Sequence, residues 1–181
     1  YHHSLAVANL AEAAAEKVGA NPTICRVAAY FHDIGKLVKP DYFTENMHAG
    51  INPHDDLTPT MSALIIIAHV KEGVDLALKH KLNPRILEVI REHHGNSLVG
   101  YFYQRALNQQ KDAELGGKLL NLRPEDVPQV SEANFRYPGP CPHTKESAIL
   151  CLADAVESAS RSLERPTPQR IEDLVNRIIN D

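Results

Sequence analysis

The stretch Ala28-Ala29-Tyr30-Phe31-His32-Asp33-Ile34-Gly35-Lys36 joins an apolar helical segment to an adjacent histidine and aspartate. Adjacent residues of a helix point about 100° apart, so His32 and Asp33 cannot both face one distant point of a packed core. Both side chains can reach a metal ion that lies where the helix stops, and the two oxygens of an aspartate can bridge two ions. The stretch therefore predicts a helix that ends at a metal centre.

Helix signals continue on both sides of this stretch, whereas strand alternation is nearly absent. An Asn-Pro or Thr-Pro pair, which supplies the cap and the first residue of a helix, occurs before four of the expected helices. The irregular regions 39–57 and 114–143 are long enough to be functional lids or insertions. The sequence thus predicts an all-α fold. The expected helices span residues 4–18, 22–34, 59–71, 84–94, 98–112, 145–163 and 168–180.

Length, charge and cysteine content exclude several classes of protein. The 181 residues suit a single domain. A formal net charge of -4 excludes a broad basic face for DNA or RNA. The cysteines, Cys25, Cys141 and Cys151, are odd in number and lack metal-site spacing, which favours a reduced cytosolic protein over a disulfide scaffold. No apolar run approaches the length of a membrane span, so these residues are expected to be soluble.

Several of the 10 histidines lie in apolar helical settings, where an unpaired imidazole costs free energy. Taken alone, His69 fits a core histidine bonded to a backbone carbonyl, since it follows the run 64–68, which is expected to be buried almost all round. Taken alone, His93 and His94 fit a cationic cap at the end of a helix. Asp154 lies in an otherwise apolar helix face, and a buried aspartate needs a cation or several donors.

One metal centre satisfies all of these side chains at once, whereas separate explanations are needed otherwise. The ligands are imidazole nitrogens and carboxylate oxygens without a thiolate. This set suits iron(II), manganese(II) or zinc in a hydrolytic role better than a structural zinc site. His48, His54 and His80 are expected to be surface or supporting residues.

The ordered set of motifs resembles the HD-domain metal-dependent phosphohydrolases, through His3, the pair His32-Asp33 and the distal Asp154. His69 and the pair His93-His94 match the members of that superfamily that bind two metals. Further segments narrow the resemblance to the PgpH-type proteins, membrane receptors with seven transmembrane helices and an intracellular HD hydrolase domain. These segments are 1–5 (YHHSL), 32–36 (HDIGK), 52–55 (NPHD), 62–71 (SALIIIAHVK), 92–95 (EHHG), 101–103 (YFY) and 135–140 (FRYPGP).

The resemblance implies hydrolysis of cyclic di-AMP to linear pApA by a hydroxide bound to two divalent ions, iron or manganese. It also implies one ion held by His3, His32, Asp33 and Asp154. Asp33 would bridge to a second ion held by His69 and His93, with His94 beside that ion or at a substrate phosphate. The implied catalytic residues are Asp33, Lys36 and His94.

The resemblance further implies that residues 1–181 form one HD domain of a longer protein, anchored at the cytoplasmic face of a bacterial membrane. The stretch 108–134 is longer than the family leads us to expect, and it is interpreted as an insertion near the substrate.

Four residues besides His94 are candidates for substrate contact. Lys36 lies one turn past the His-Asp pair and is placed to contact a phosphate oxygen, or else it is a solvated lysine at a helix end. Arg136, Tyr137 and Lys145 flank a proline-rich loop that could cover a base or the second phosphate, with a surface-loop role as the alternative.

Two other functions remain open. One is an HD hydrolase of another nucleotide, such as cyclic di-GMP, guanosine tetraphosphate or a deoxynucleotide. The absence of a Gly-Tyr-Pro signature after the HD motif disfavours cyclic di-GMP. The other is a non-catalytic HD module that only binds a ligand, which would lack metal ligands, although none is missing here. The oligomeric state is left open.

Overall fold

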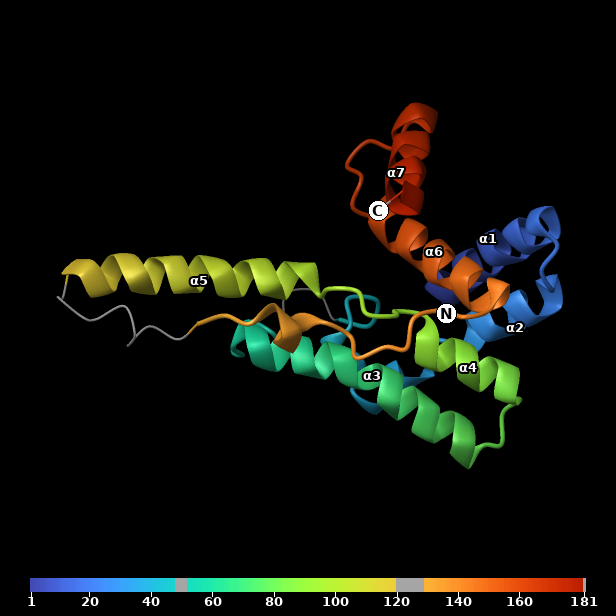
Figure 1. The fold of residues 1–181 in the computed structure, drawn as a ribbon, viewed down its shortest axis with the longest axis horizontal. Helices are drawn as coiled ribbons and strands as arrows, with labels where there is room; N and C mark the ends of the chain where they lie inside the picture. The colour runs from blue at the N-terminus through green and yellow to red at the C-terminus, as the bar shows by residue number, and fades with distance from the viewer. Residues whose placement is uncertain (48–51, 120–128, 181) are drawn as a thin grey trace.

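The structure is a computed structural model that describes residues 1–47, 52–119 and 129–180. Over these residues it contains seven α-helices and no strand, which confirms the predicted all-α class (Figure 1). The α-helices are α1 (His2–Val18), α2 (Pro22–Phe31), α3 (Pro59–Lys79), α4 (Pro84–Glu92), α5 (Gly100–Leu119), α6 (Lys145–Ser160) and α7 (Pro168–Asn180). Short 3-10 helices are η1 (Ile34–Val38), η2 (Pro40–Tyr42) and η4 (Glu132–Phe135).

The helices begin where the capping residues predict. Helices α2, α3 and α4 each start with a proline, and the preceding Asn21, Thr58 or Asn83 accepts a hydrogen bond from a backbone N–H of the first turn. Their ends differ from the prediction. Helix α2 stops at Phe31, and the chain turns into η1, whereas α3 continues to Lys79.

A close backbone contact fixes how η1, which follows α2, packs against α3. A Cβ on Gly35 would lie 1.8 Å from the carbonyl oxygen of His69 and 2.5 Å from the amide nitrogen of Gly73. Two glycines therefore let η1 pack directly on the backbone of α3. The missing side chain at Gly73 leaves room for the backbone of Gly35, which offsets the usual cost of a glycine inside a helix.

The region predicted as irregular between residues 114 and 143 is partly helical. Helix α5 continues to Leu119, past the expected end at residue 112, and η4 covers Glu132–Phe135. Of the predicted insertion 108–134, residues 120–128 lie outside the described part of the chain. The prediction of a uniform loop is therefore wrong for the residues that the structure describes.

Two hydrophobic cores share helix α3. The larger core joins α1, α2, α4 and α6 to the C-terminal half of α3, and it includes Val7, Ala28, Ile90 and Leu150. The smaller core joins Ala63 of α3 to α5 and η4. Figure 1 shows the result, a bundle from which α5 extends beside the first half of α3, while α7 stands apart on α6.

The arm made by α3 and α5 corrects one prediction about burial. Residues 64–68 are not buried almost all round, because Leu64 is 50% exposed and residues 65–68 are only partly buried. In the described part of the chain, residues of α5 and η4 pack against this half of α3. His69 follows the run and is 1% exposed, so it is more deeply buried than residues 64–68.

A short antiparallel bridge holds the loop after η4 against the end of α4. The amide of Val99 donates to the carbonyl of Phe135 at 2.8 Å, and the amide of Tyr137 donates to the carbonyl of Ser97 at 3.0 Å.

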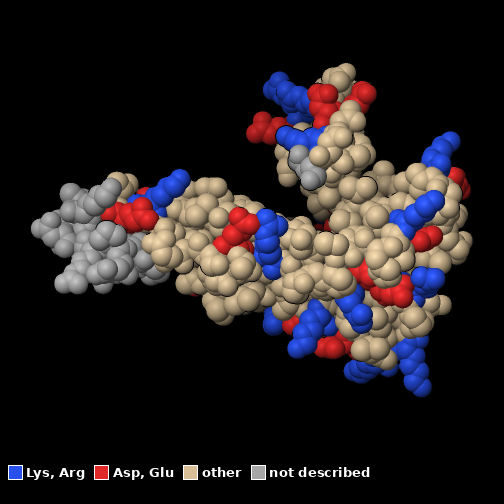
Figure 2. Space-filling model, viewed as in Figure 1, with Lys and Arg blue, Asp and Glu red and all other residues tan. Residues whose placement is uncertain are grey.

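Figure 2 shows acidic and basic side chains interspersed on the face that it draws. Among the described helices, none is both long and apolar enough to cross a membrane.

Candidate metal centre

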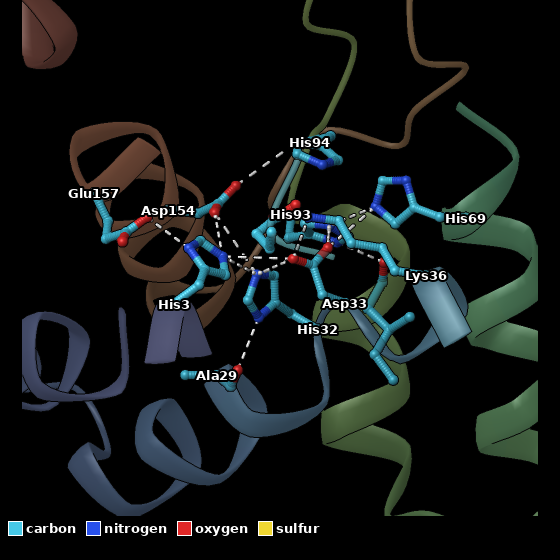
Figure 3. Close-up of polar contacts among 12 residues, drawn as sticks. His3, Ala29, His32, Asp33, Lys36, His69, His93, His94, Asp154 and Glu157 are labelled. Atoms are coloured by element: carbon cyan, nitrogen blue, oxygen red, sulfur yellow. Dashed lines mark hydrogen bonds and ion pairs between the residues drawn. The ribbon is translucent and has the colours of Figure 1, made fainter. Parts of the chain in front are cut away.

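All seven predicted metal ligands lie together (Figure 3). The first cluster consists of His3 on α1, His32 at the end of α2 and Asp154 on α6. The second cluster consists of His69 on α3 with His93 and His94 at the end of α4. In the first cluster, and in the second cluster together with Asp33, the ligand atoms lie within 4.8 Å of one another.

Asp33 lies between the clusters and turns one oxygen toward each. Its Oδ2 is 3.4 Å from Nε2 of His3 and 3.3 Å from Nε2 of His32. Its Oδ1 is 3.4 Å from Nε2 of His69 and 3.7 Å from Nε2 of His93. Asp33 reaches both sides because it follows the last turn of α2, where the chain leaves the helix. This geometry is the one that a carboxylate bridging two ions requires.

Hydrogen bonds at Nδ1 fix the orientation of the imidazoles. In His32, His69 and His93, Nδ1 donates to the backbone carbonyl three residues earlier, at 2.8, 2.5 and 2.8 Å respectively. In each ring Nδ1 therefore carries a proton, and Nε2 is the atom that faces the centre. This is the tautomer in which a histidine binds a metal through Nε2.

The arrangement of His69 and His93 shows whether these residues fit a metal ion, because their Nε2 lone pairs face each other. Nε2 of His69 lies 3.3 Å from Nε2 of His93, and both rings carry their proton on Nδ1. Two lone pairs at this distance repel unless a cation lies between them. Oδ1 of Asp33 faces the same point and is buried without a hydrogen-bond partner. The second cluster therefore fits a divalent cation.

The first cluster has a strong negative field. His3 lies 3.1 Å from Oδ1 of Asp154 and donates through Nδ1 to Glu157 at 2.6 Å. Although burial lowers it, bonds to Asp154, Asp33 and Glu157 raise the pKa of His3 to about 9. Burial likewise opposes a raised pKa at His32, but Asp33 and Asp154 raise it to about 10.

The second cluster has the opposite electrostatics. Burial is the main cause that lowers the pKa of His93, and nearby imidazoles add to it. Burial and the neighbouring His93 and His69 hold the pKa of His94 well below its usual range. Burial raises the pKa of Asp33, but His32 and the other imidazoles outweigh it, so the Asp33 carboxyl has a pKa well below its usual range. The pKa values of His93 and His94 are thus lowered, whereas those of His3 and His32 are raised.

Glu157 is a supporting residue that the sequence analysis missed. It lies one turn after Asp154 on α6, and its carboxylate fixes the ring of His3 as backbone carbonyls fix the other rings. Arg161, a further turn along, is 3.1 Å from the same carboxylate. The three-residue spacing from Asp154 was the available signal, but a glutamate at that spacing is also common on solvated helix faces.

A cleft of about 510 Å³ opens on the centre. Its walls include ligands from both clusters, His69, His94 and Asp154, together with Lys36. Aromatic side chains from three segments complete it: Tyr42, Phe43, Tyr101, Phe102 and Tyr137.

The four predicted substrate residues have different positions. Lys36 and Tyr137 line the cleft, and the ring of Tyr137 stacks on His94 with centroids 4.3 Å apart. Arg136 instead bonds to the carbonyl of Asn96 and to Glu132. Arg136 therefore braces the loop, which is the surface-loop role.

Lys145 requires a correction. Its Nζ donates to the carbonyl of Val18 at the end of α1, and it lines no part of the cleft. Lys145 begins α6, and Asp154 lies nine residues later, a separation of about 14 Å along the helix axis.

The histidines expected to be ordinary are mixed in character. His80 caps α3 and is exposed. His54 is only 3% exposed and lines the cleft, where its Nε2 donates to the carbonyl of Tyr42. His48 lies outside the described residues.

Comparison with known proteins gives consistent results. A family model described as HD domain matches residues 1–159. The cyclic-di-AMP phosphodiesterase PgpH of Bacillus subtilis (strain 168) is 45% identical over 181 residues, which are 100% of this chain and 23% of that protein. The protein of the same name from Listeria monocytogenes (strain 10403S) is 44% identical over 181 residues, with the same coverage. The chain thus spans 23% of the length of these relatives.

A solved structure matches equally well. The HD domain of the phosphodiesterase PgpH from L. monocytogenes, in complex with cyclic-di-AMP, has a TM-score of 0.86 and 44% sequence identity to this chain. The match covers 100% of this chain and 77% of that one. These findings confirm the resemblance that the motifs predicted.

Proposed function

This chain belongs to the HD-domain family, and from this premise we propose that it is a metal-dependent phosphodiesterase that hydrolyses cyclic di-AMP to linear pApA. The substrate is inferred from relatives that are named for cyclic di-AMP and from a matched structure that contains it. The reaction class is inferred from the centre itself, whose ligands are those of a hydrolytic metal site.

The observation that carries the proposal is Asp33, with one oxygen turned to each cluster. We infer two divalent ions, iron or manganese, the first held by His3, His32, Asp33 and Asp154. The second would be held by Asp33, His69 and His93, with His94 beside it. When bound, such ions lower the pKa of water and neutralise the negative charge of a phosphate.

The cleft supplies the surfaces that a dinucleotide needs. Its aromatic walls offer flat faces for adenine bases, which stack on aromatic rings by about 1–3 kcal/mol per base. Tyr137 backs His94 on the floor of the cleft, so the imidazole is fixed for contact with a phosphate oxygen. Lys36 lies on the same wall and brings a positive charge to the edge of the centre.

Lys36 keeps its charge at neutral pH. Burial alone would lower its pKa, but Asp33 and Glu45 raise it to about 12. An ammonium group in this position binds a non-bridging phosphate oxygen and stabilises the charge that builds up as the phosphodiester bond breaks. We assign Asp33, Lys36 and His94 as catalytic residues on these grounds.

The place of the domain in a longer protein is also proposed. Since the chain covers 23% of its curated relatives, we propose that residues 1–181 are one domain of a larger protein, anchored at the cytoplasmic face of a bacterial membrane. Segment 108–134 is proposed to be a substrate-side insertion, of which residues 120–128 lie outside the described part.

Turnover of a nucleotide panel tests the function. Protein loaded with manganese or iron should convert cyclic di-AMP to pApA, with slower turnover of cyclic di-GMP, guanosine tetraphosphate and deoxynucleotides. His93→Ala should abolish turnover, whereas His80→Ala, an exposed histidine, should retain it. Faster turnover of another nucleotide would replace the substrate assignment. Binding without turnover, or protein that takes up no metal, would support a non-catalytic module.

A further inference from the structure

The ammonium group of Lys36 is held by two carboxylates at the edge of the centre. Its Nζ lies 2.7 Å from Oδ2 of Asp33 and 2.7 Å from Oε1 of Glu45. The side chains of Lys36 and Glu45 are 18% and 20% exposed. At these distances both contacts are charge-assisted hydrogen bonds in a partly dehydrated setting, where they are stronger than surface ion pairs.

The loop that carries Glu45 is built around the same ammonium. Phe43, two residues earlier, lies beneath Lys36 with Nζ 5.2 Å from its ring centre. Phe43 is buried and also packs edge-on against His69, with centroids 5.7 Å apart. The carbonyl of Tyr42 accepts a hydrogen bond from His54. The loop therefore holds Glu45 and Phe43 on two sides of one cation.

Glu45 could instead be read as a metal ligand, because its carboxylate forms a possible site with His3 and Asp33. The position of Lys36 argues against that reading. Its ammonium already lies between the Glu45 and Asp33 carboxylates, so a divalent ion there would meet a positive charge at close range. Glu45 therefore serves the lysine and not an ion.

The two partners of Lys36 are not equivalent once ions bind. Asp33 Oδ2 faces the first cluster, so an ion held there would compete with Lys36 for the lone pairs of this oxygen. Glu45 alone then keeps the ammonium in place. A lysine side chain has four flexible bonds, and without a fixed partner it would spread over many rotamers.

We propose that Glu45 is a positioning residue that holds the ammonium of Lys36 at the mouth of the centre, aimed at the substrate phosphate, while Asp33 is engaged by metal. This inference deepens the proposed function and rests on it for the identity of the substrate. It assigns to loop 39–47 a direct task in catalysis, namely to keep one cation oriented.

A double-mutant cycle tests the coupling. Glu45→Gln and Lys36→Met should each lower kcat/KM for cyclic di-AMP by about 10- to 100-fold, the range seen when a supporting partner of a site residue is removed. The double variant should be no slower than the slower single variant, because both changes remove one interaction. Effects that multiply would overturn the proposal. Glu72→Gln, which breaks the more exposed Lys39–Glu72 pair, should leave kcat/KM unchanged.

Two readouts that do not depend on turnover complete the test. In protein with ¹⁵N-labelled lysines, the Lys36 ammonium, assigned by its loss in Lys36→Met, should exchange protons slowly in the wild type and rapidly in Glu45→Gln. Metal content should be the same in Glu45→Gln and the wild type. Unchanged exchange, or a lost ion, would overturn the proposal. Wild-type protein that fails to hydrolyse cyclic di-AMP would refute the function, while proton exchange would still decide the role of Glu45.

Discussion

The two ligand clusters on either side of Asp33 differ in charge. In the first cluster, two imidazoles face Asp154, and Glu157 adds a further carboxylate behind His3. In the second cluster, His69 and His93 face Oδ1 of Asp33, and Nδ1 of His94 lies 3.9 Å from Oδ2 of Asp154. The carboxylates of the first cluster attract any positive charge, including a proton. In the second cluster the lowered pKa values of His93 and His94 favour neutral imidazoles.

This difference predicts that two ions, one in each cluster, would not be equivalent. Carboxylate oxygen favours harder cations, and imidazole favours iron, zinc and similar ions. Protonation of its imidazoles opposes an ion in the first cluster, whereas the second has bare Nε2 atoms ready for coordination. The first cluster is thus expected to depend on pH more strongly than the second, and the two clusters have the Asp33 carboxylate in common.

The largest expected effect comes from removing the shared ligand. Asp33→Ala should lose both ions and all measurable turnover of cyclic di-AMP, because each cluster loses the oxygen that faces it. Elemental analysis and a turnover assay measure this. Asp75→Ala, at an exposed position of α3, is the matched control and should behave as the wild type. An Asp33→Ala protein that keeps either ion at full content would contradict the role of Asp33 as a ligand shared by the two clusters.

The next largest effect tests how the clusters are held together. Gly35→Ala places a methyl group within 1.8 Å of the His69 carbonyl, so η1 and α3 must separate. The free energy of unfolding should fall by about 3 kcal/mol, and the second ion should bind more weakly because His69 moves from Asp33. Thermal melting and metal titration measure both effects.

Gly116→Ala is the control for this change. Gly116 lies inside α5, and a Cβ there meets no atom within 4 Å. Alanine should raise the free energy of unfolding by about 0.5–1 kcal/mol there. Equal behaviour of the two variants would show that the close backbone contact is unimportant.

A smaller effect separates the clusters. Glu157→Gln removes the carboxylate behind His3, so affinity for the first ion should fall by about 10- to 100-fold while affinity for the second stays unchanged. Competition with a chromophoric chelator resolves the two affinities. Glu164→Gln, an exposed glutamate after α6, should change neither. A loss shared equally by both ions would contradict the separation.

The smallest effect is the pH dependence of metal binding. The raised pKa values of His3 and His32, about 9 and about 10, mean that both are protonated at pH 7 without metal. An ion bound in the first cluster should therefore release protons, and its affinity should rise with pH up to about pH 10. The second ion should release none from His93 and His94, whose pKa values are lowered. Calorimetry in buffers of different ionisation enthalpy counts these protons.

The same shifts affect the stability of the metal-free protein. Because the folded pKa values of His3 and His32 lie above the ordinary value of 6.5, protonation stabilises the fold fully below that pH. This stabilisation should be lost as the pH rises through 9 to 10. Melting temperatures of chelator-treated protein across this range measure it, and a melting temperature that does not fall would contradict the assigned charges.

Residue type and local setting were enough to predict where the ligands meet. His32, His93 and Asp154 are polar groups at helix ends or in apolar faces, where only a shared partner removes the cost of burial. Proline caps predicted where helices begin, because a cap is a local interaction. Helix ends were predicted less well, since the end of α2 depends on a contact between Gly35 and a helix far along the chain.

Contacts made by loops were beyond reach of the sequence. Glu45 lies in a segment without periodicity, so nothing local indicated that it faces Lys36. Lys145 was predicted to contact substrate because it is close in sequence to the loop that contains Tyr137. Its side chain instead points to the end of α1. Burial of residues 64–68 was overestimated, because an apolar run shows that a surface needs covering but not how completely neighbours cover it.

The spread of the first cluster along the chain has a mechanical consequence. His3 and Asp154 are separated by 151 positions and belong to helices near opposite ends of the chain. An ion held by both is a cross-link that closes most of the polypeptide into one loop. By the chain-entropy relation for cross-links, a loop of that size removes about 5 kcal/mol of freedom from the unfolded chain. A metal ion bound there would thus stabilise the fold as a reversible cross-link, in addition to its part in catalysis.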